Sequence, residues 1–508
     1  MEKITTPMNP KIKPTDSLRP WIALLLSVMI HDNAARRVVT HLDTIIAQGD
    51  VGDRLPSVRT LMTELGVSPA TVRAAVSELV RADRIETISG SGTFILAEPR
   101  PQSDDGDRGW QTAALSPHHL DIDFPGPLQS TAPPDTIDLA SGYPDATLQP
   151  IALLTKAMRD AARRPGTYGR APGEGLEPLR SWFANELHPR GQHDVLITSG
   201  GQSALSLIFR SIALPGDTVA METPTYIGAI AACRAAGLTP AAVTADDSGI
   251  RVDQLEAVIE ATGARLVYLQ PRFHNPTGAH LLAERRQPLM ELAAERGLIL
   301  IEDDWLHDLD DPATRSRPLA SNDPNGHVIH IRSLSKSVAP AMRIAGIASQ
   351  GVIAERLKAM RTVEDFFVSP ILQETALNVV TSTGWARHLR AMRLELRTRQ
   401  AALRDAIAAT DCSESNPVGG PLHLWLRLPP HLDALAVRDA ALRRGVSIIA
   451  GNQWHPSDPR STHIRLSNAS APVTQIVEGV RRLGSALDAV RLGPPAFRNV
   501  STVIEDVC

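Results

Sequence analysis

The chain has few cysteines, few lysines and no long apolar run, and these scarcities exclude several classes of protein. Its three cysteines, Cys233, Cys412 and Cys508, are widely spaced. We therefore expect a reducing cytoplasmic compartment, no disulfide framework and no metal site. The most apolar early stretch, residues 21–30, is about half the ~20 residues that span a bilayer and has no adjacent basic region or cleavage site. A packed helix is expected there.

Charge gives no global indication of a nucleic-acid partner. The chain has 52 Lys and Arg against 56 Asp and Glu, a net charge of -4, so any DNA binding must come from a local surface. With 508 residues it exceeds what one hydrophobic core usually serves, and two or more domains are expected. Its 43% hydrophobic and 21% charged residues are ordinary for a soluble protein.

The residue pattern changes twice along the chain. Apolar residues first recur at helical spacing, then a stretch rich in Pro, Asp, Ser, Gly and His follows, and short apolar runs then alternate with amphipathic stretches. The last pattern predicts a mostly parallel sheet covered by helices. As a flexible coil, the middle stretch of about 37 residues would span roughly 30 to 35 Å. The predicted divisions are an N-terminal extension (1–33), a first domain (34–98), a linker (99–135), a second domain (136–495, with a smaller α+β subdomain mainly at 370–495) and a tail (496–508).

Two short helices and a hairpin are expected within the first domain. Ser57 is a good N-cap for a helix that begins at Val58, and Ser68 caps a second helix with Pro69 at its first position. Two such helices joined by a tight turn predict a helix-turn-helix. Residues 85–96 form two β-rich arms around glycines, which predicts a wing.

This segment resembles the GntR-type winged helix through Leu55-Pro-Ser-Val-Arg59, Leu65-Gly-Val-Ser-Pro-Ala-Thr-Val72 and Gly90-Ser-Gly-Thr-Phe94. The resemblance implies double-stranded DNA as the partner, with Gly92 letting the wing approach the minor groove. Residues 31–98 hold seven arginines and nine acidic residues, which predicts modest non-specific affinity and leaves open a small helical domain used only for protein contacts. The DNA contacts implied by the resemblance are Arg54, Ser57, Arg59, Ser68, Thr71, Arg73 and Gly92.

Four motifs follow apolar runs in the second domain, where ligands bind in open α/β sheets. The first is a glycine-rich turn whose backbone N–H groups at Gly200, Gly201 and Gln202 suit a phosphate. The order and spacing of the four resemble the fold type I aminotransferases. The motifs are Val195 to Leu205, Gln270-Pro-Arg-Phe-His-Asn-Pro-Thr-Gly278, Ile299-Leu-Ile-Glu-Asp-Asp-Trp305 and Ser333-Leu-Ser-Lys-Ser-Val-Ala-Pro-Ala-Met-Arg343.

The resemblance implies pyridoxal 5'-phosphate (PLP) as cofactor. Lys336, one of only six lysines, would form the Schiff base, which requires a deprotonated amine of the kind that burial promotes. Asp303 would pair with the pyridinium nitrogen, Asn275 would donate to the ring oxygen, and Tyr226 would stack on the ring. The other implied contacts are the phosphate cup of Ser333, Ser335 and Arg343, Tyr168 at the phosphate bound by a partner subunit, and Arg465 with Gly142 at a substrate or effector carboxylate.

Two positions depart from the aminotransferase pattern. Trp305 stands where a tyrosine is usual, and because an indole donates a hydrogen bond but cannot shuttle a proton, efficient transamination is disfavoured. In contrast, the Asn275-Pro-Thr-Gly278 sequence is typical of working aminotransferases. Gly228 stands where some relatives carry a second carboxylate-reading arginine, which disfavours a GABA-like ω-amino acid.

A winged helix-turn-helix followed by an α/β fold type I aminotransferase-like domain with a smaller α+β subdomain is similar to the MocR/GabR family of bacterial regulators. The resemblance implies a domain-swapped homodimer and a PLP-dependent transcription regulator that senses an amino compound, or PLP itself, through an aldimine at Lys336. One alternative is a catalytically active aminotransferase with an accessory winged helix, which sustained keto-acid production would reveal. A DNA-binding protein that has lost PLP is disfavoured by the presence of Lys336, Asp303, Asn275 and Arg343.

Overall fold

The chain forms two compact units, Met1–Ser116 and Pro117–Cys508. The apolar run at 21–30, the tail at 496–508 and most of the predicted linker lie outside the described residues. Among the helices that are described, none is long and apolar enough to cross a membrane. The computed structural model describes residues 36–46, 49, 52–81, 84–88, 92–96, 109–115, 132–187, 194–410, 419–457 and 462–492.

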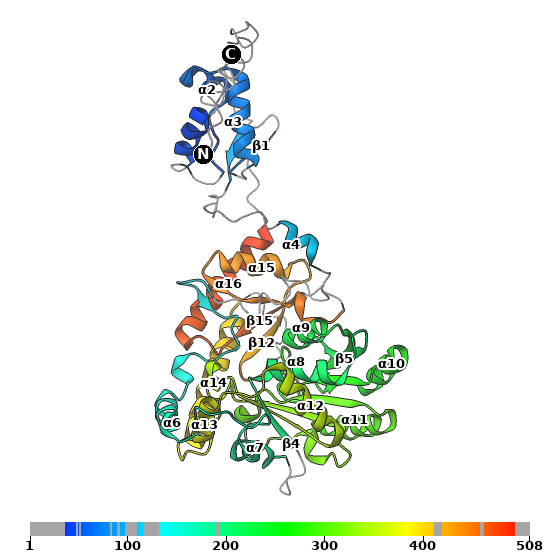
Figure 1. The fold of residues 1–508 in the computed structure, drawn as a ribbon. Helices are drawn as coiled ribbons and strands as arrows, with labels where there is room; N and C mark the ends of the chain where they lie inside the picture. The colour runs from blue at the N-terminus through cyan, green and yellow to red at the C-terminus, as the bar shows by residue number, and fades with distance from the viewer. Residues whose placement is uncertain are drawn as a thin grey trace, which may run out of the picture. The chain divides into compact units, whose positions relative to one another are not determined.

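The first unit contains a helix-turn-helix followed by a two-stranded hairpin (Figure 1). A helical segment over 36–46 precedes α2 (Val58–Leu65) and α3 (Pro69–Arg81), and β1 (Ile85–Ile88) pairs antiparallel with β2 (Gly92–Ile95). The apolar faces of these elements form one core, because each helix carries apolar residues at helical spacing. Its buried members include Val38, Leu42, Leu61, Val72, Leu79, Ile85 and Ile95.

Both predicted helix caps are present. Ser57 Oγ accepts a hydrogen bond from Thr60 N at 3.2 Å, and Ser68 Oγ accepts one from Thr71 N at 3.2 Å. Each cap satisfies one of the N–H groups that a helix start leaves without an intrahelical partner. These local signals fix where the two helices of the motif begin.

A short helix, α4 (Gly109–Ala114), lies inside the range predicted as a linker. The composition of that range indicated coil, and a segment of six residues is too short to show a helical period. The described part of the predicted linker is therefore not coil throughout.

The second unit is built on an eight-stranded sheet. Two strands run antiparallel to their neighbours and the other strands share one direction, as expected for a mostly parallel sheet. The strand order is β4 (Asp194–Thr198), β11 (Ala345–Ser349, antiparallel), β10 (Val328–Ser333), β9 (Ile299–Asp303), β8 (Leu266–Leu269), β5 (Thr218–Thr223), β6 (Thr239–Asp246) and β7 (Gly249–Ile250, antiparallel).

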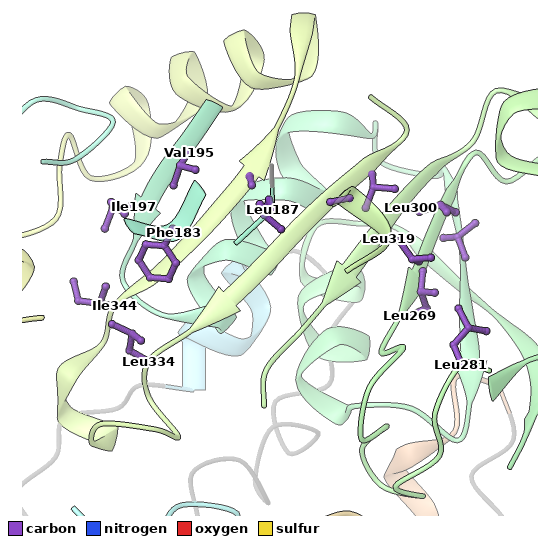
Figure 2. Packing of buried hydrophobic residues seen from close by; sticks show 14 of the residues in the cluster. Phe183, Leu187, Val195, Ile197, Leu269, Leu281, Leu300, Leu319, Leu334 and Ile344 are labelled. Carbon is purple, nitrogen blue, oxygen red and sulfur yellow. The ribbon is translucent and has the colours of Figure 1, made fainter. Parts of the chain in front are cut away.

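Helices cover both faces of this sheet, because its strands are apolar on both sides. Val195 and Ile197 of β4 pack into the core of one face, whereas Leu196 packs into the core of the other. Figure 2 shows part of the first core, where Phe183 lies near Ile197. The first face is covered by α7 (Glu177–Ala184), α10 (Val252–Thr262), α11 (Ala283–Arg296) and α13 (Pro370–Val380), and the second by α8 (Gly201–Ile212), α9 (Ile227–Ala235) and α12 (Gly351–Glu364).

The predicted smaller α+β subdomain is also present and has its own core. The segment that follows the predicted linker joins it, since Leu139 N donates to Ser447 O and Ser467 N donates to Leu139 O. α6 (Ile151–Arg163) then leads into the large domain. The subdomain consists of β3 (Ile137–Asp138), α14 (Trp385–Ala408), β12 (His423–Arg427), α15 (Ala434–Leu442), β13 (Val446–Ser447), β14 (Ile449–Ala450), β15 (His463–Ser467) and α16 (Val473–Leu492).

Candidate functional site

A cavity of about 500 Å³ lies where the carboxyl ends of β8, β9 and β10 meet the small subdomain. Motifs that are far apart in the sequence converge here, because parallel strands end at the same edge of a sheet. Gly200 and Tyr168 are outside the lining. The lining brings together the predicted residues Gly142, Gly201, Gln202, Tyr226, Asn275, Asp303, Ser333, Ser335, Lys336, Arg343 and Arg465.

The Lys336 amine lies inside this cavity, 3.3 Å from the centre of the Tyr143 ring. Burial holds the pKa of Lys336 well below its usual value, and the nearby cations Arg465 and Arg343 lower it further. This lowering favours the uncharged form of the amine. That is the form in which a lysine can attack an aldehyde.

Asp303 is buried at the end of β9. Its Oδ2 accepts hydrogen bonds from Tyr268 Oη at 2.8 Å and Gln270 Nε2 at 3.0 Å. Burial raises the pKa of Asp303 to about 6, and the two hydrogen bonds oppose this rise. Tyr268 and Gln270 were not predicted from the sequence, although polar side chains in and after the apolar run of β8 are a signal that could have identified them.

Arg465 is a buried cation with no carboxylate in ion-pair contact among the described residues. Its Nη1 donates to Asn275 Oδ1 at 3.2 Å, its Nη2 donates to Ala140 O at 2.6 Å, and its Nε has no partner. Burial lowers its pKa to about 10, so it stays charged at neutral pH. A buried charge that is held only by neutral oxygens favours an anionic ligand. Gly142 leaves room here, because a Cβ on it would lie 3.6 Å from Nη2 of Arg465.

The other end of the cavity is suited to a phosphate. Gly200 precedes α8 with a φ of +92°, and a Cβ there would lie 2.8 Å from Arg343 Cζ. The Arg343 guanidinium is held by Ser199 O at 2.9 Å, and Ser335 Oγ is buried without a partner. A helix N-terminus, an arginine and an unused hydroxyl together form an anion site. The side chains therefore fit PLP, with an anion site at one end, a buried lysine amine whose pKa is lowered, and a buried carboxylate for the ring.

Two aromatic side chains form further walls. Tyr226 Oη donates to Gln202 Oε1 at 3.1 Å, and burial raises the pKa of Tyr226. Trp305 Nε1 donates to Phe273 O at 3.1 Å, so the indole N–H is occupied by backbone. Trp305 therefore offers the cavity an apolar face and no proton donor. Tyr143 and Trp454 also line the cavity and were not predicted.

Tyr168 lies away from the cavity of its own chain. Its side chain is 77% exposed, and its hydroxyl donates to Ala162 O at 3.0 Å. Within the part of the chain that the structure describes, no contact gives Tyr168 a ligand role. Its predicted contact with the phosphate of a second subunit stays a prediction.

Asp304, His307 and His330 form a buried group whose ligand atoms are of the kind that bind metals. Arg272, however, donates to both oxygens of Asp304, at 2.9 and 3.4 Å. Burial alone would raise the pKa of Asp304, but His307 and Arg272 hold it well below its usual value. The carboxylate is already neutralised by side chains, which favours a structural network behind the cavity.

The predicted DNA contacts of the first unit lie on α2, α3 and the wing. Of these, Thr71 is buried, and its hydroxyl is bonded to that of Ser68 at 2.8 Å, so it positions Ser68 and does not itself reach the surface. A Cβ on Gly92 would lie 2.5 Å from Arg54 Nε. Gly92 is therefore required for the approach of Arg54 to the wing. The side chains of Arg54, Ser57, Arg59, Ser68 and Arg73 are exposed.

Comparison with known proteins gives two family matches. Residues 134–483 match the family "Aminotransferase class I and II", and residues 34–95 match "Bacterial regulatory proteins, gntR family". HTH-type transcriptional regulator YdfD of Bacillus subtilis is 27% identical over 88% of this chain and 95% of its own. The vitamin B6 salvage pathway transcriptional repressor PtsJ of Salmonella typhimurium is 31% identical over 76% of this chain and 82% of its own.

Solved structures of aminotransferases share the fold of the second unit. The α-aminoadipate aminotransferase LysN of Thermus thermophilus, complexed with N-(5'-phosphopyridoxyl)-L-leucine, has a TM-score of 0.67 and 27% identity and covers 75% of this chain and 99% of its own. Kynurenine aminotransferase of Pyrococcus horikoshii has a TM-score of 0.67 and 25% identity, with 75% and 98% coverage. The predicted fold class and the PLP cofactor are confirmed. The chain belongs to the aminotransferase class I and II family and carries a gntR-type DNA-binding domain, the domain combination of the MocR/GabR-type transcription regulators.

Proposed function

We propose that the protein is a PLP-dependent transcription regulator whose second unit binds an amino acid and thereby changes the affinity of the winged helix for DNA. The observation that carries this proposal is the position of Arg465. It is a buried, charged guanidinium without a carboxylate partner among the described residues, and it lies in the same cavity as the amine of Lys336, whose pKa burial lowers. It is also hydrogen-bonded to the segment that follows the predicted linker.

Five side chains would hold the cofactor. Lys336 would attach it, Asp303 would pair with its ring nitrogen, and Asn275, whose Oδ1 faces Arg465, would offer its amide N–H to the ring oxygen. Arg343 and Ser335 would hold the phosphate. When bound, PLP supplies an aldehyde that condenses with primary amines and a ring that withdraws electrons.

The cavity is connected through a backbone carbonyl to the segment that follows the predicted linker. Arg465 Nη2 donates to Ala140 O, and an effector carboxylate that binds Arg465 bidentately would take this place. Ala140 belongs to the segment 138–143, where Asp138 Oδ1 accepts from Ala140 N and Ser141 N at 2.9 Å each. The Tyr143 ring of the same segment lies over the Lys336 amine, where an incoming amine must approach.

An effector can act only through different affinities for two arrangements of the protein. Release of Ala140 O would favour an arrangement in which the segment 138–143 has moved. Since this segment follows the linker in the chain, its movement would alter how the winged helix is held. This links the occupancy of the cavity to DNA affinity.

A domain-swapped homodimer in the cytoplasm is part of the proposal. Several large apolar side chains of the second unit are exposed in the single chain, among them Tyr168 (77%), Val363 (79%) and Phe366 (59%). Burying such side chains against a second copy would be favourable. In that dimer Tyr168 would reach the cofactor phosphate bound by the partner subunit.

The second candidate is an active aminotransferase. The complete set of Lys336, Asp303, Asn275 and Arg465 in one cavity favours it. Against it, the indole of Trp305 gives its N–H to Phe273 O and cannot transfer a proton. Keto-acid release from an amino donor, measured over many turnovers, separates the two candidates.

The variant Lys336→Ala tests the proposal. We expect it to lose the visible absorbance of bound PLP and the response of DNA binding to amino acids, while still binding DNA through the winged helix. Lys156→Ala, at an exposed lysine of α6 that pairs with Asp160, is the matched control and should behave as the wild type. A Lys336→Ala protein that keeps the wild-type spectrum would overturn the assignment of the cofactor site.

A further inference from the structure

A row of arginines runs along α14 and plays no part in the PLP cavity. Arg387, Arg390 and Arg397 are exposed, and Arg393 and Arg404 are half-buried. At 3.6 residues per turn these positions fall within an arc of about 120° and extend over roughly 26 Å of helix. The opposite face of the helix is buried in the protein through Trp385, Met392, Leu396, Leu403 and Ile407.

The three exposed arginines of this row are not neutralised by carboxylates of the described residues. No carboxylate of the described residues forms an ion pair with Arg387, Arg390 or Arg397. Glu395, the acidic residue in the middle of the helix, pairs instead with the buried Arg399. Residues 385–408 carry six arginines and two acidic residues in total.

The arginines are also close enough to repel one another. Arg393 Nη1 donates to the backbone carbonyls of Asp308 and Asp310, at 3.1 and 3.2 Å. Burial lowers the pKa of Arg393, and the Asp311 carboxylate opposes this effect. The positive charges of Arg397, Arg315 and Arg390 lower the pKa further. Like charges three or four residues apart on a helix repel one another, so an anionic partner that binds the row would reduce this electrostatic repulsion.

The winged helix itself has more acidic than basic residues. Over residues 31–98 nine acidic residues outnumber seven arginines, so this domain supplies few of the phosphate contacts on which DNA affinity depends. A second basic surface elsewhere in the chain would supply them. The row on α14 is positively charged and exposed, as contacts with DNA phosphates require.

We propose that the α14 arginine row contacts the phosphate backbone of the duplex DNA that the winged helix binds. This inference rests on the proposed DNA-binding function. Duplex DNA is a linear array with one negative charge per ~1.7 Å of its axis, so a straight row of exposed arginines, roughly 15 Å long from Arg387 to Arg397, can follow it. A lipid surface is disfavoured, because the apolar face of α14 is buried in the core and cannot enter a membrane.

The test is the salt dependence of DNA binding by the PLP-loaded, full-length protein. The variant replaces Arg387, Arg390 and Arg397 by alanine, and the probes are a duplex from upstream of its own coding sequence and a duplex of scrambled sequence. Each phosphate contact contributes about 0.9 to the slope of log affinity against log salt, so loss of three contacts should reduce the slope by about 2.7 on both probes.

Two controls make the result specific. Arg265, Arg356 and Arg443 are exposed arginines elsewhere in the second unit, and their joint replacement by alanine changes the net charge equally but should leave the slope unchanged. Replacing the three α14 arginines by lysine keeps the charge and should keep the slope. The PLP spectrum of all variants should match that of the wild type, and their melting temperature should not fall below it, since these side chains are exposed.

A slope that is equal in the α14 alanine variant and its control variant would overturn the inference and leave an acidic protein as the candidate partner of this row. If the wild-type protein binds neither duplex, the proposed function itself fails. If Arg59→Ala in the winged helix weakens binding while the α14 alanine variant does not, only the present inference fails.

Discussion

Replacing Arg465 by methionine should remove the selectivity of the cavity for amino acids over simple amines. Methionine has a similar length and is apolar, so it fills the same space without the charge. Among the described residues, the Arg465 guanidinium donates hydrogen bonds only to Asn275 Oδ1 and Ala140 O, and burial already lowers its pKa to about 10. Because the substitution removes a buried cation that lacks a counter-ion, it should not lower the stability of the protein.

The size of the effect follows from the burial of the charge. Arg465 is 6% exposed, so an effector carboxylate would meet it out of contact with water. Removing one partner of a buried, hydrogen-bonded charge pair costs about 2 to 5 kcal/mol. At 1.4 kcal/mol for each factor of ten, Arg465→Met should weaken binding of a carboxylate ligand by roughly 30-fold to a few thousand-fold.

The assay compares two ligands that differ only in the carboxylate. L-Leucine and isopentylamine are titrated into PLP-loaded wild-type and Arg465→Met protein while the visible spectrum is followed. The wild type should bind leucine more tightly than the amine, and the variant should bind the two alike. Unchanged leucine affinity in the variant, or an equal loss for both ligands, would refute the role assigned to Arg465.

Further predictions concern the wing, the cofactor ring and stability. Gly92→Ala places a Cβ 2.5 Å from Arg54 Nε at a φ of +130°, so it should weaken DNA binding measured by fluorescence anisotropy. The control Gly52→Ala is also strained, at a φ of +93°, but its Cβ meets no other atom of the described residues and should leave DNA binding unchanged. Tyr268→Phe removes the hydrogen bond that lowers the pKa of Asp303 and should weaken PLP binding by about tenfold or more in a spectroscopic titration. Burial raises the pKa of Glu222 to about 8, so the stability that its protonated form contributes below pH 4.5 is lost as the pH rises through 8. Glu222→Gln cannot ionise, so its free energy of unfolding in urea should rise relative to that of the wild type over this pH range. A difference in unfolding free energy that does not depend on pH would contradict this.

Features that depend on local sequence were predictable. Ser57 and Ser68 mark helix starts because a cap needs only its own next residues. The motifs that contain Asp303 and Lys336 were placed near one another because both accompany the ends of apolar strands, and parallel strands end at one edge of a sheet. The composite fold and most of the cavity lining followed from these signals and from the family resemblance.

Features that depend on tertiary contacts were not predictable. The hydrogen bonds of Tyr268 and Gln270 to Asp303 require the register between β8 and β9. The bond from Arg465 to Ala140 O joins positions 325 residues apart. Thr71 matched the family's DNA-contact pattern, yet the packing of α3 buries it. Sequence pattern assigns a residue to an element, but its partners come from the packing of several elements.

The most direct test of regulation is a DNA-binding titration of the PLP-loaded protein with and without amino acids. The visible spectrum and keto-acid release are recorded in the same samples. The account predicts that one amino acid shifts the spectrum and changes the affinity for DNA without sustained keto-acid release. DNA should in turn change the affinity of the protein for that amino acid by the same factor, as linkage requires. An amino acid that shifts the spectrum and is turned over to keto acid, while DNA affinity stays constant, would contradict the account and establish the aminotransferase.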